Sequence, residues 1–261
     1  MAEYIVARKT RNAASSAVHV LLNLLLGVGS VMITLLSGSP VLGLILVLAS
    51  KWRVFAVRPR YLWVNIKSSL VDFIVGASII LLTYYSGTDI MIVDILLAII
   101  YCVWLIIIKP RTSETANLVQ ALVAIFLGTA TTSLMTSGTD SILIVLLSFI
   151  IGYSASRHVL IQSEDNKYAS LIILICGLVF AEIAWLCHSW MIIYTFGNTG
   201  IRIPQLAIFL TLIAFTYNSI RLTMLRYDGK LRIKNVLTPL IFCIVTVLVI
   251  ALFFSNPIFN I

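Results

Sequence analysis

Three carboxylates fall inside segments that are otherwise apolar: Asp72, Asp94 and Glu182. An ionised carboxylate near the centre of a bilayer costs on the order of 3 kcal/mol or more, so each one needs a partner or a proton. Such a group can carry a proton or a cation, and together with a histidine it can bind a metal or act in acid–base chemistry. His188 is the histidine nearest to Glu182 in the chain. The candidate intramembrane polar site therefore consists of Glu182, Asp94, His188 and Asp72.

Glu182 interrupts the run GLVFAEIAWLCHSW at residues 177–190. A rise of ~1.5 Å per residue puts it roughly 10 Å below the outer surface, one layer deeper than Asp94. Because a glutamate facing lipid is hard to tolerate, we expect its side chain to face the interior of the helix bundle. There it would be either a protonated group that ties helices together or a proton or ion site. His188 is rotated by ~120° from Glu182, so a direct bond within the helix is not expected.

Asp72 lies about one turn from the cytoplasmic end of its predicted helix. Lys67 and the cations of residues 51–60 are within reach, so an interfacial ion pair is the expected role. Three uncharged polar residues, Asn23, Gln120 and Asn218, are predicted to occupy the same half of the membrane. Polar groups in both halves could line an aqueous path, but hydrogen bonds between helices would use the same residue types.

The elements that must position these residues are transmembrane helices. Of the 261 residues, 61% are hydrophobic and 11% are charged, and the mean hydropathy is +1.08. One soluble core cannot bury that much apolar surface, so residues 1–261 are predicted to form a single integral membrane domain. The expected fold is all-α, a polytopic bundle of about nine helices. Their predicted ranges are 17–36, 40–55, 69–86, 90–108, 116–136, 141–156, 169–190, 204–221 and 236–255.

The basic residues predict how the chain is threaded. If the N-terminus is cytoplasmic, seventeen of the eighteen lysines and arginines fall on the cytoplasmic side, and only Arg202 falls outside. This bias orients helices during insertion, so we expect an external C-terminus and a location in the plasma (cytoplasmic) membrane. The net charge of +8 is dispersed over short loops, which argues against a nucleic-acid groove.

The segment KWRVFAVRPRYLWVNIK at 51–67 interleaves cations with aromatic rings. Both kinds of side chain suit the headgroup layer, and each cation near anionic lipid contributes ~1 kcal/mol. We expect interfacial anchoring, with specific binding of a lipid phosphate or a partner as the alternative. The predicted contacts to anionic headgroups are Lys51, Arg53, Arg58 and Arg60.

The turn SGSP at 37–40 recurs as SGTD at 86–89 and at 137–140. One interpretation is a tandem repeat of helical hairpins over 17–60, 68–111, 115–158 and 168–222, followed by a last helix at 236–255. The other is that helix-end chemistry alone selects these residues. The longer outer connection, 191–203, is either a re-entrant or lid-like loop or an ordinary interfacial one.

No enzyme signature accompanies these features. The sequence has no HExxH, GxSxG or Walker A motif, and its four cysteines fall inside predicted helices without metal-binding spacing. We therefore predict no catalytic residue, no metal and no cofactor. The segments 51–67, IGYSASRHVL at 151–160 and GLVFAEIAWLCHSWMIIYTF at 177–196 resemble a family of uncharacterised polytopic membrane proteins from small-genome, candidate-phylum bacteria. The resemblance implies a bacterial membrane protein and no particular activity.

Two functions are compatible with this pattern. Hairpin repeats and a core carboxylate favour a proton- or cation-coupled small-molecule transporter, or the membrane subunit of one. Short loops without a soluble domain favour the alternative, a structural or assembly subunit of a membrane or envelope complex. Its partners would be other membrane proteins or further copies of the chain. An intramembrane lipid-modifying enzyme is the least supported class.

Overall fold

The computed structural model describes residues 2–85, 91–138, 141–161, 168–195, 201–227, 233–253 and 258–259. Within these residues, seven helices are long and apolar enough to cross a membrane, and two further apolar helices are shorter. The protein is therefore a multi-pass helical membrane protein. The elements are α1 (Ala2–Ser37), α2 (Pro40–Ser50), α3 (Trp52–Phe55), α4 (Pro59–Tyr85), α5 (Met91–Val103), η1 (Trp104–Ile108), α6 (Glu114–Met135), α7 (Ser141–Leu160), α8 (Ala169–His188), β1 (Ile192–Thr195), β2 (Arg202–Pro204), α9 (Gln205–Arg226), α10 (Ile233–Phe253) and β3 (Ile258–Phe259).

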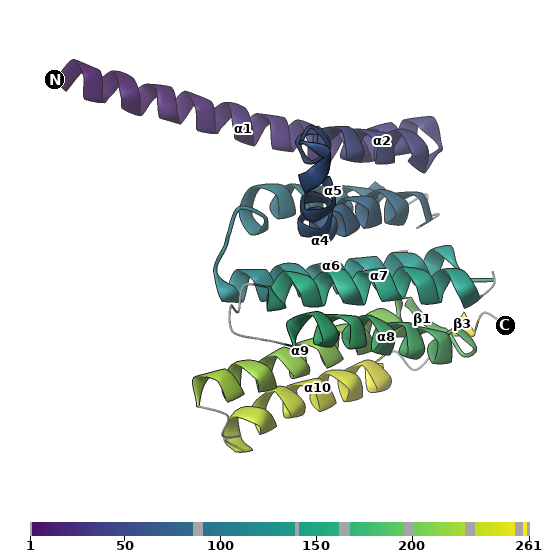
Figure 1. The fold of residues 1–261 in the computed structure, drawn as a ribbon. Coiled ribbons are helices and arrows are strands. Elements are labelled where there is room, and N and C mark those ends of the chain that lie inside the picture. Colours follow the sequence, from purple (N-terminus) through teal and green to yellow (C-terminus); the bar gives the residue numbers. More distant parts are fainter. Residues whose placement is uncertain are drawn as a thin grey trace.

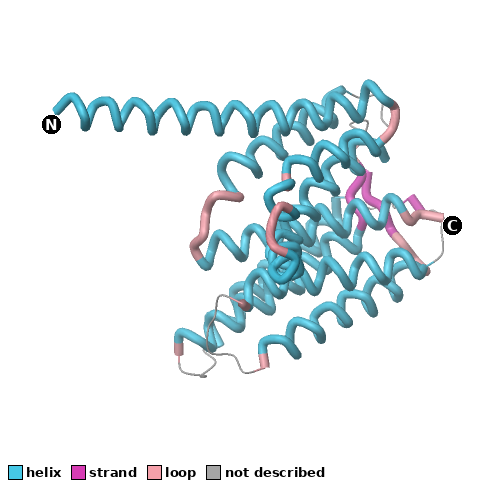
Figure 2. The backbone as a smooth tube through the Cα atoms, turned by 45° about the horizontal axis from the view of Figure 1, so that its top comes forward, coloured by secondary structure: helices cyan, strands magenta, loops and turns pink. Residues whose placement is uncertain are grey.

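The long helices stack roughly side by side in chain order, from α1 and α2 at one edge to α10 at the other (Figure 1). The first turns of α1 and the ends of α5, α7 and α9 lie at one end of the bundle, which we call the basic end. The three strands lie at the opposite end, as Figure 2 also shows. This arrangement agrees with the predicted threading except at residues 51–67, which were expected at the basic end, and the assignment of that end to the cytoplasm stays a prediction.

Helix α6 is the central element and packs against α4, α7 and α9. Two thirds of its most apolar stretch is buried, more than in any other spanning helix of the described chain. Its buried hydroxyls bond to carbonyls one turn back in the same helix, as Thr129 does to Ile125 and Ser133 to Thr129. Thr131 also donates to the carbonyl of Ser78 on α4 over 3.2 Å. These hydroxyls are therefore satisfied by backbone and do not line an aqueous path.

The predicted helix 40–55 is wrong in its extent. Helix α2 ends at Ser50, and α3 forms a separate turn before α4 begins at Pro59. Eleven residues rise only about 16 Å, roughly half the ~30 Å of a hydrocarbon core. Figure 1 places α3 between the two ends of the bundle. The chain thus crosses only part of the bundle in α2 and then returns through α4 to the end where α2 began.

The first short turn shows how the sequence stops one helix and starts the next. Gly38 has φ +59°, which L side chains rarely adopt, and it ends α1. Ser39 then caps α2 by accepting a hydrogen bond from the Val41 amide, with Pro40 in the first turn. The corresponding residues 86–89 lie outside the described residues, so the hairpin repeats stay a prediction.

The outer connection contains strands that the sequence analysis did not predict. Strands β1 and β2 pair antiparallel, with Tyr194 opposite Ile203, and β3 pairs with the other edge of β1. Residues 196–200 of this connection are outside the described residues. Because β3 follows α10 in the chain, this pairing holds Ile258 and Phe259 at the end of the bundle opposite the basic end (Figure 1).

Candidate functional site

Asp72 binds three side chains where α2 ends against α4. Lys51 Nζ bonds to the carboxylate oxygen Oδ2, and Lys109 Nζ lies 2.8 Å from the same oxygen. Trp104 Nε1 donates to the other oxygen, Oδ1, over 3.0 Å. The predicted ion pair with a cation of residues 51–60 is therefore confirmed. Lys109 and Trp104 were missed, although Lys109 ends the apolar run of residues 90–108 and Trp104 lies five residues before it.

The prediction that Lys51 reaches lipid headgroups is wrong. Its side chain is only 6% exposed, because Asp72 supplies the opposite charge inside the bundle. Lys67, the other predicted partner of Asp72, lies instead over the ring of Trp63, 5.1 Å from its centroid. Three cations of the same segment are exposed, and their contact with headgroups stays a prediction: Arg53, Arg58 and Arg60.

A turn of π-helix, η1, lies directly beside this ion pair. The Lys109 amide donates to the carbonyl of Trp104, five residues back, over 2.9 Å. Gln120 on α6 uses its amide nitrogen to bind the carbonyls of Ile108 and Arg111, at 2.8 and 2.9 Å. Its amide oxygen is 2.7 Å from His158 Nε2 on α7. Single π turns are frequent at functional sites, so this network marks the basic half of the bundle as a candidate site.

Glu182 is exposed on the outside of α8, and the expectation that it faces the bundle interior is wrong. Helix α8 buries the opposite face, with Gly177, Phe180 and Ala184, against α7. The exposed stripe that contains Glu182 is otherwise apolar near the carboxylate, with Leu178 one turn before it and Trp185 one turn after. An all-apolar helix carries no sequence signal for which face packs, which explains the error.

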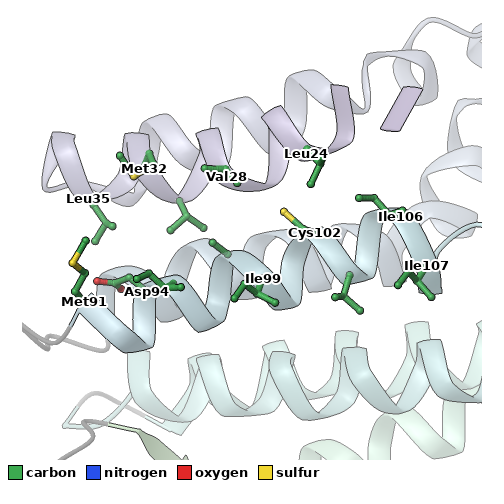
Figure 3. Close-up of a pocket in the computed structure, with 14 residues that line it drawn as sticks. Leu24, Val28, Met32, Leu35, Met91, Asp94, Ile99, Cys102, Ile106 and Ile107 are labelled. Atoms are coloured by element: carbon green, nitrogen blue, oxygen red, sulfur yellow. The ribbon is translucent and has the colours of Figure 1, made fainter. Parts of the chain in front are cut away.

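Asp94 lies near the start of α5 and lines a groove between α1 and α5 (Figure 3). The groove has a volume of about 510 Å³ and an apolar lining that includes Val28, Met32 and Ile99. One carboxylate oxygen, Oδ1, is buried and has no hydrogen-bond partner among the described residues. Among the described residues that line this groove, Asp94 is the only acidic one.

The four residues predicted as one polar site are not brought together. Asp72 belongs to the basic half of the bundle, whereas Asp94 is on α5 at the other end. Helix α8, which carries Glu182 and the half-buried His188, packs on α7 and α9, while α5 packs on α1 and α4. Among the residues described here, no three His, Cys, Asp or Glu side chains are placed to hold a metal ion.

The remaining predicted polar residues make local bonds. Asn23 bonds to His19 within α1 at 3.0 Å, and Asn218 donates to the carbonyl of Ala214 within α9 at 2.9 Å. Only Gln120 of this set links different helices. The set therefore gives no support to a continuous polar path.

Comparison with known proteins adds no family: no family model, curated protein or solved structure matches the chain. The resemblance to membrane proteins of small-genome bacteria stays a prediction. The features that bear on function are the exposed Glu182, the Asp72 network and the groove at Asp94.

Proposed function

We propose that the protein is a membrane subunit that binds a transmembrane helix of a different protein on the exposed face of α8. The observation that carries this proposal is Glu182, a carboxylate on an outward stripe between Leu178 and Trp185. The opposite face of α8 packs on α7, with fewer contacts to α9, and the stripe that contains Glu182 is exposed among the described residues.

The energetics favour a partner that carries a cation. An ionised carboxylate exposed to hydrocarbon costs on the order of 3 kcal/mol or more, and Glu182 lies too deep in α8 to reach the nearer headgroups easily. A lysine, arginine or histidine at the same depth on a neighbouring helix would neutralise it and satisfy its lone pairs. The apolar side chains around Glu182 would then pack against that helix and exclude lipid.

The test is photo-crosslinking in native membranes with a photoreactive amino acid at position 178. Leu178 is 52% exposed beside Glu182, and Leu146 on α7, 57% exposed, gives a control position at another apolar surface. We expect a protein adduct from position 178 that disappears with Glu182→Leu, and only lipid adducts from position 146. An adduct that persists with Glu182→Leu, or joins two copies of this chain, would overturn the proposal.

Charge reversal identifies the partner's residue. The adduct is digested to locate the crosslinked helix, and the basic residue on that helix nearest in depth is replaced by glutamate. We expect Glu182→Lys to abolish the adduct and the double reversal to restore it. Failure of every such pair to restore the adduct would show that charge does not hold the two helices together.

A second candidate is the proton- or cation-coupled carrier that the sequence also favours, now centred on Asp72 instead of Glu182. The supporting observation is that a broken segment, α2 to α4, and the π turn η1 meet at the Asp72 ion pair. Interrupted helices surround the binding sites of many carriers. Proteoliposomes containing a pH-sensitive dye test this role: a proton gradient should collapse faster with the protein than with its Asp72→Asn variant. Equal rates for both proteins and empty liposomes would exclude proton coupling.

A further inference from the structure

We propose that the groove between α1 and α5 binds one acyl chain of a membrane lipid whose headgroup carries a primary ammonium, with Asp94 as the headgroup acceptor. Figure 3 shows Asp94 with Met91 and Leu35 at one end of the groove and Leu24 with Ile107 at the other. The occupant is therefore expected to be apolar along the groove and cationic at the Asp94 end.

The length of the groove fits a single acyl chain. Asp94 and Ile107 are thirteen positions apart on one continuous helical segment, which corresponds to roughly 20 Å at ~1.5 Å per residue. This exceeds half of the ~30 Å hydrocarbon thickness, so one acyl chain from the leaflet nearest Asp94 can lie along it. The exposed rim, which includes Val28, Met32 and Ile99, leaves the groove open sideways to lipid.

The charge and the unpaired acceptor of Asp94 determine which lipid headgroup is preferred. The buried Oδ1 of Asp94 has no partner among the described residues, and such an acceptor is costly to leave unpaired in an apolar setting. A primary ammonium can donate hydrogen bonds to the carboxylate and neutralise it, whereas a quaternary choline group has no N–H to donate. An anionic headgroup would be repelled.

Native mass spectrometry of the purified full-length chain tests the proposal. The protein is released from micelles supplied with phosphatidylethanolamine, phosphatidylcholine or phosphatidylglycerol that carry the same two palmitoyl chains. We expect one retained ethanolamine lipid per chain, at about tenfold higher occupancy than either other lipid, as a charge-assisted bond would give. Equal retention of the three lipids, or retention of none, would overturn the proposal.

Four variants distinguish the contribution of the headgroup contact from that of the acyl chain in the groove. Asp94→Asn should remove the preference for ethanolamine, while Glu182→Gln, a carboxylate change outside the groove, should not. Val28→Trp fills the groove from its rim and should lower retention of every lipid. Leu25→Trp places the same side chain on α1, at a 60% exposed position that does not line the groove, and should leave retention unchanged.

Two results would contradict the site even if lipid is retained. One is an undiminished ethanolamine preference in Asp94→Asn. The other is equal loss of lipid in Val28→Trp and Leu25→Trp, which would place the lipid elsewhere on α1. A dimer that only Val28→Trp dissociates would show that a second copy of the chain occupies the groove. Circular dichroism of each variant confirms that the helices have formed.

Discussion

Lys51 and Asp72, 21 residues apart in the sequence, form an ion pair that fastens the end of α2 to the middle of α4. Lys109, 42% exposed, reaches the same carboxylate from the end of η1. One partly buried acid therefore holds three segments that are far apart along the chain. Removing one partner from such a pair is costly because the other charge is left buried without compensation.

Asp72→Asn is expected to lower the free energy of unfolding by roughly 3–5 kcal/mol, because Lys51 loses its counter-charge. Thermal melting in detergent gives the comparison with the unchanged protein. Glu114→Gln, at an exposed carboxylate in the first turn of α6, is the matched control and should melt like the wild type. A wild-type melting temperature for Asp72→Asn would mean that the ion pair does not hold α2 in place.

The double variant Lys51→Met with Asp72→Leu should recover part of the stability lost in Asp72→Asn, because Lys51 no longer leaves a buried charge, although the buried indole N–H of Trp104 loses its acceptor. Buried ion pairs can often be replaced by apolar groups of similar size without net loss, and the partly exposed Lys109 can turn toward solvent. The same melting experiment checks this expectation. A double variant less stable than Asp72→Asn would show that the pair contributes more than charge neutralisation.

Gln120→Leu should loosen the π turn. The substitution leaves the carbonyls of Ile108 and Arg111 without their side-chain donor and removes the partner of His158. The expected loss of stability is about 1–3 kcal/mol, with faster hydrogen exchange in residues 105–111. His158→Ala should cost less, because Gln120 keeps both bonds to the backbone. Unchanged exchange in Gln120→Leu would contradict a capping role.

The close packing of α7 on α8 depends on Gly152. A Cβ at this position would lie 2.6 Å from Cγ of Phe180, so Gly152→Ala must displace the ring. We expect a loss of about 1–3 kcal/mol in thermal melting, and partial recovery when Phe180→Leu is added. Gly29→Ala is the control, because nothing lies within 4 Å of its Cβ. Equal melting of both alanine variants would contradict the tight contact.

The sequence predicts the parts of this structure that depend on local chemistry. Apolar runs of sufficient length predict the spanning helices, and Gly38 with Ser39 predicts where one helix stops and the next begins. The pairing of Asp72 with a nearby cation follows from the cost of an isolated charge. These features need no knowledge of which helices are neighbours.

The errors concern how helices pack. Lys51 was assigned to the headgroups because lysines usually lie at the membrane boundary, and only the arrangement of α2 on α4 shows that it is buried. The sequence also does not indicate that Glu182 points outward, because both faces of α8 are apolar and lipid is as apolar as a protein core. The short strands β1 and β2 were missed because a few residues of β structure have almost no periodic signal.

In the isolated protein, Glu182→Leu tests whether the Glu182 side chain points outward or forms a hydrogen bond to another helix of the same chain. If Glu182 bonded to another helix of this chain, its loss would lower stability by ~0.6–2 kcal/mol, the worth of such a bond within a membrane. On the exposed face of α8 it has no such role, and leucine suits lipid better than a carboxylate does. We therefore expect Glu182→Leu to melt at or above the wild-type temperature in lipid nanodiscs. Phe180→Ala, two residues earlier and on the buried face of α8, should melt clearly lower, because it empties the contact with Gly152. A Glu182→Leu variant that melts as low as Phe180→Ala would place the carboxylate inside the bundle and remove the basis for a docking surface on α8.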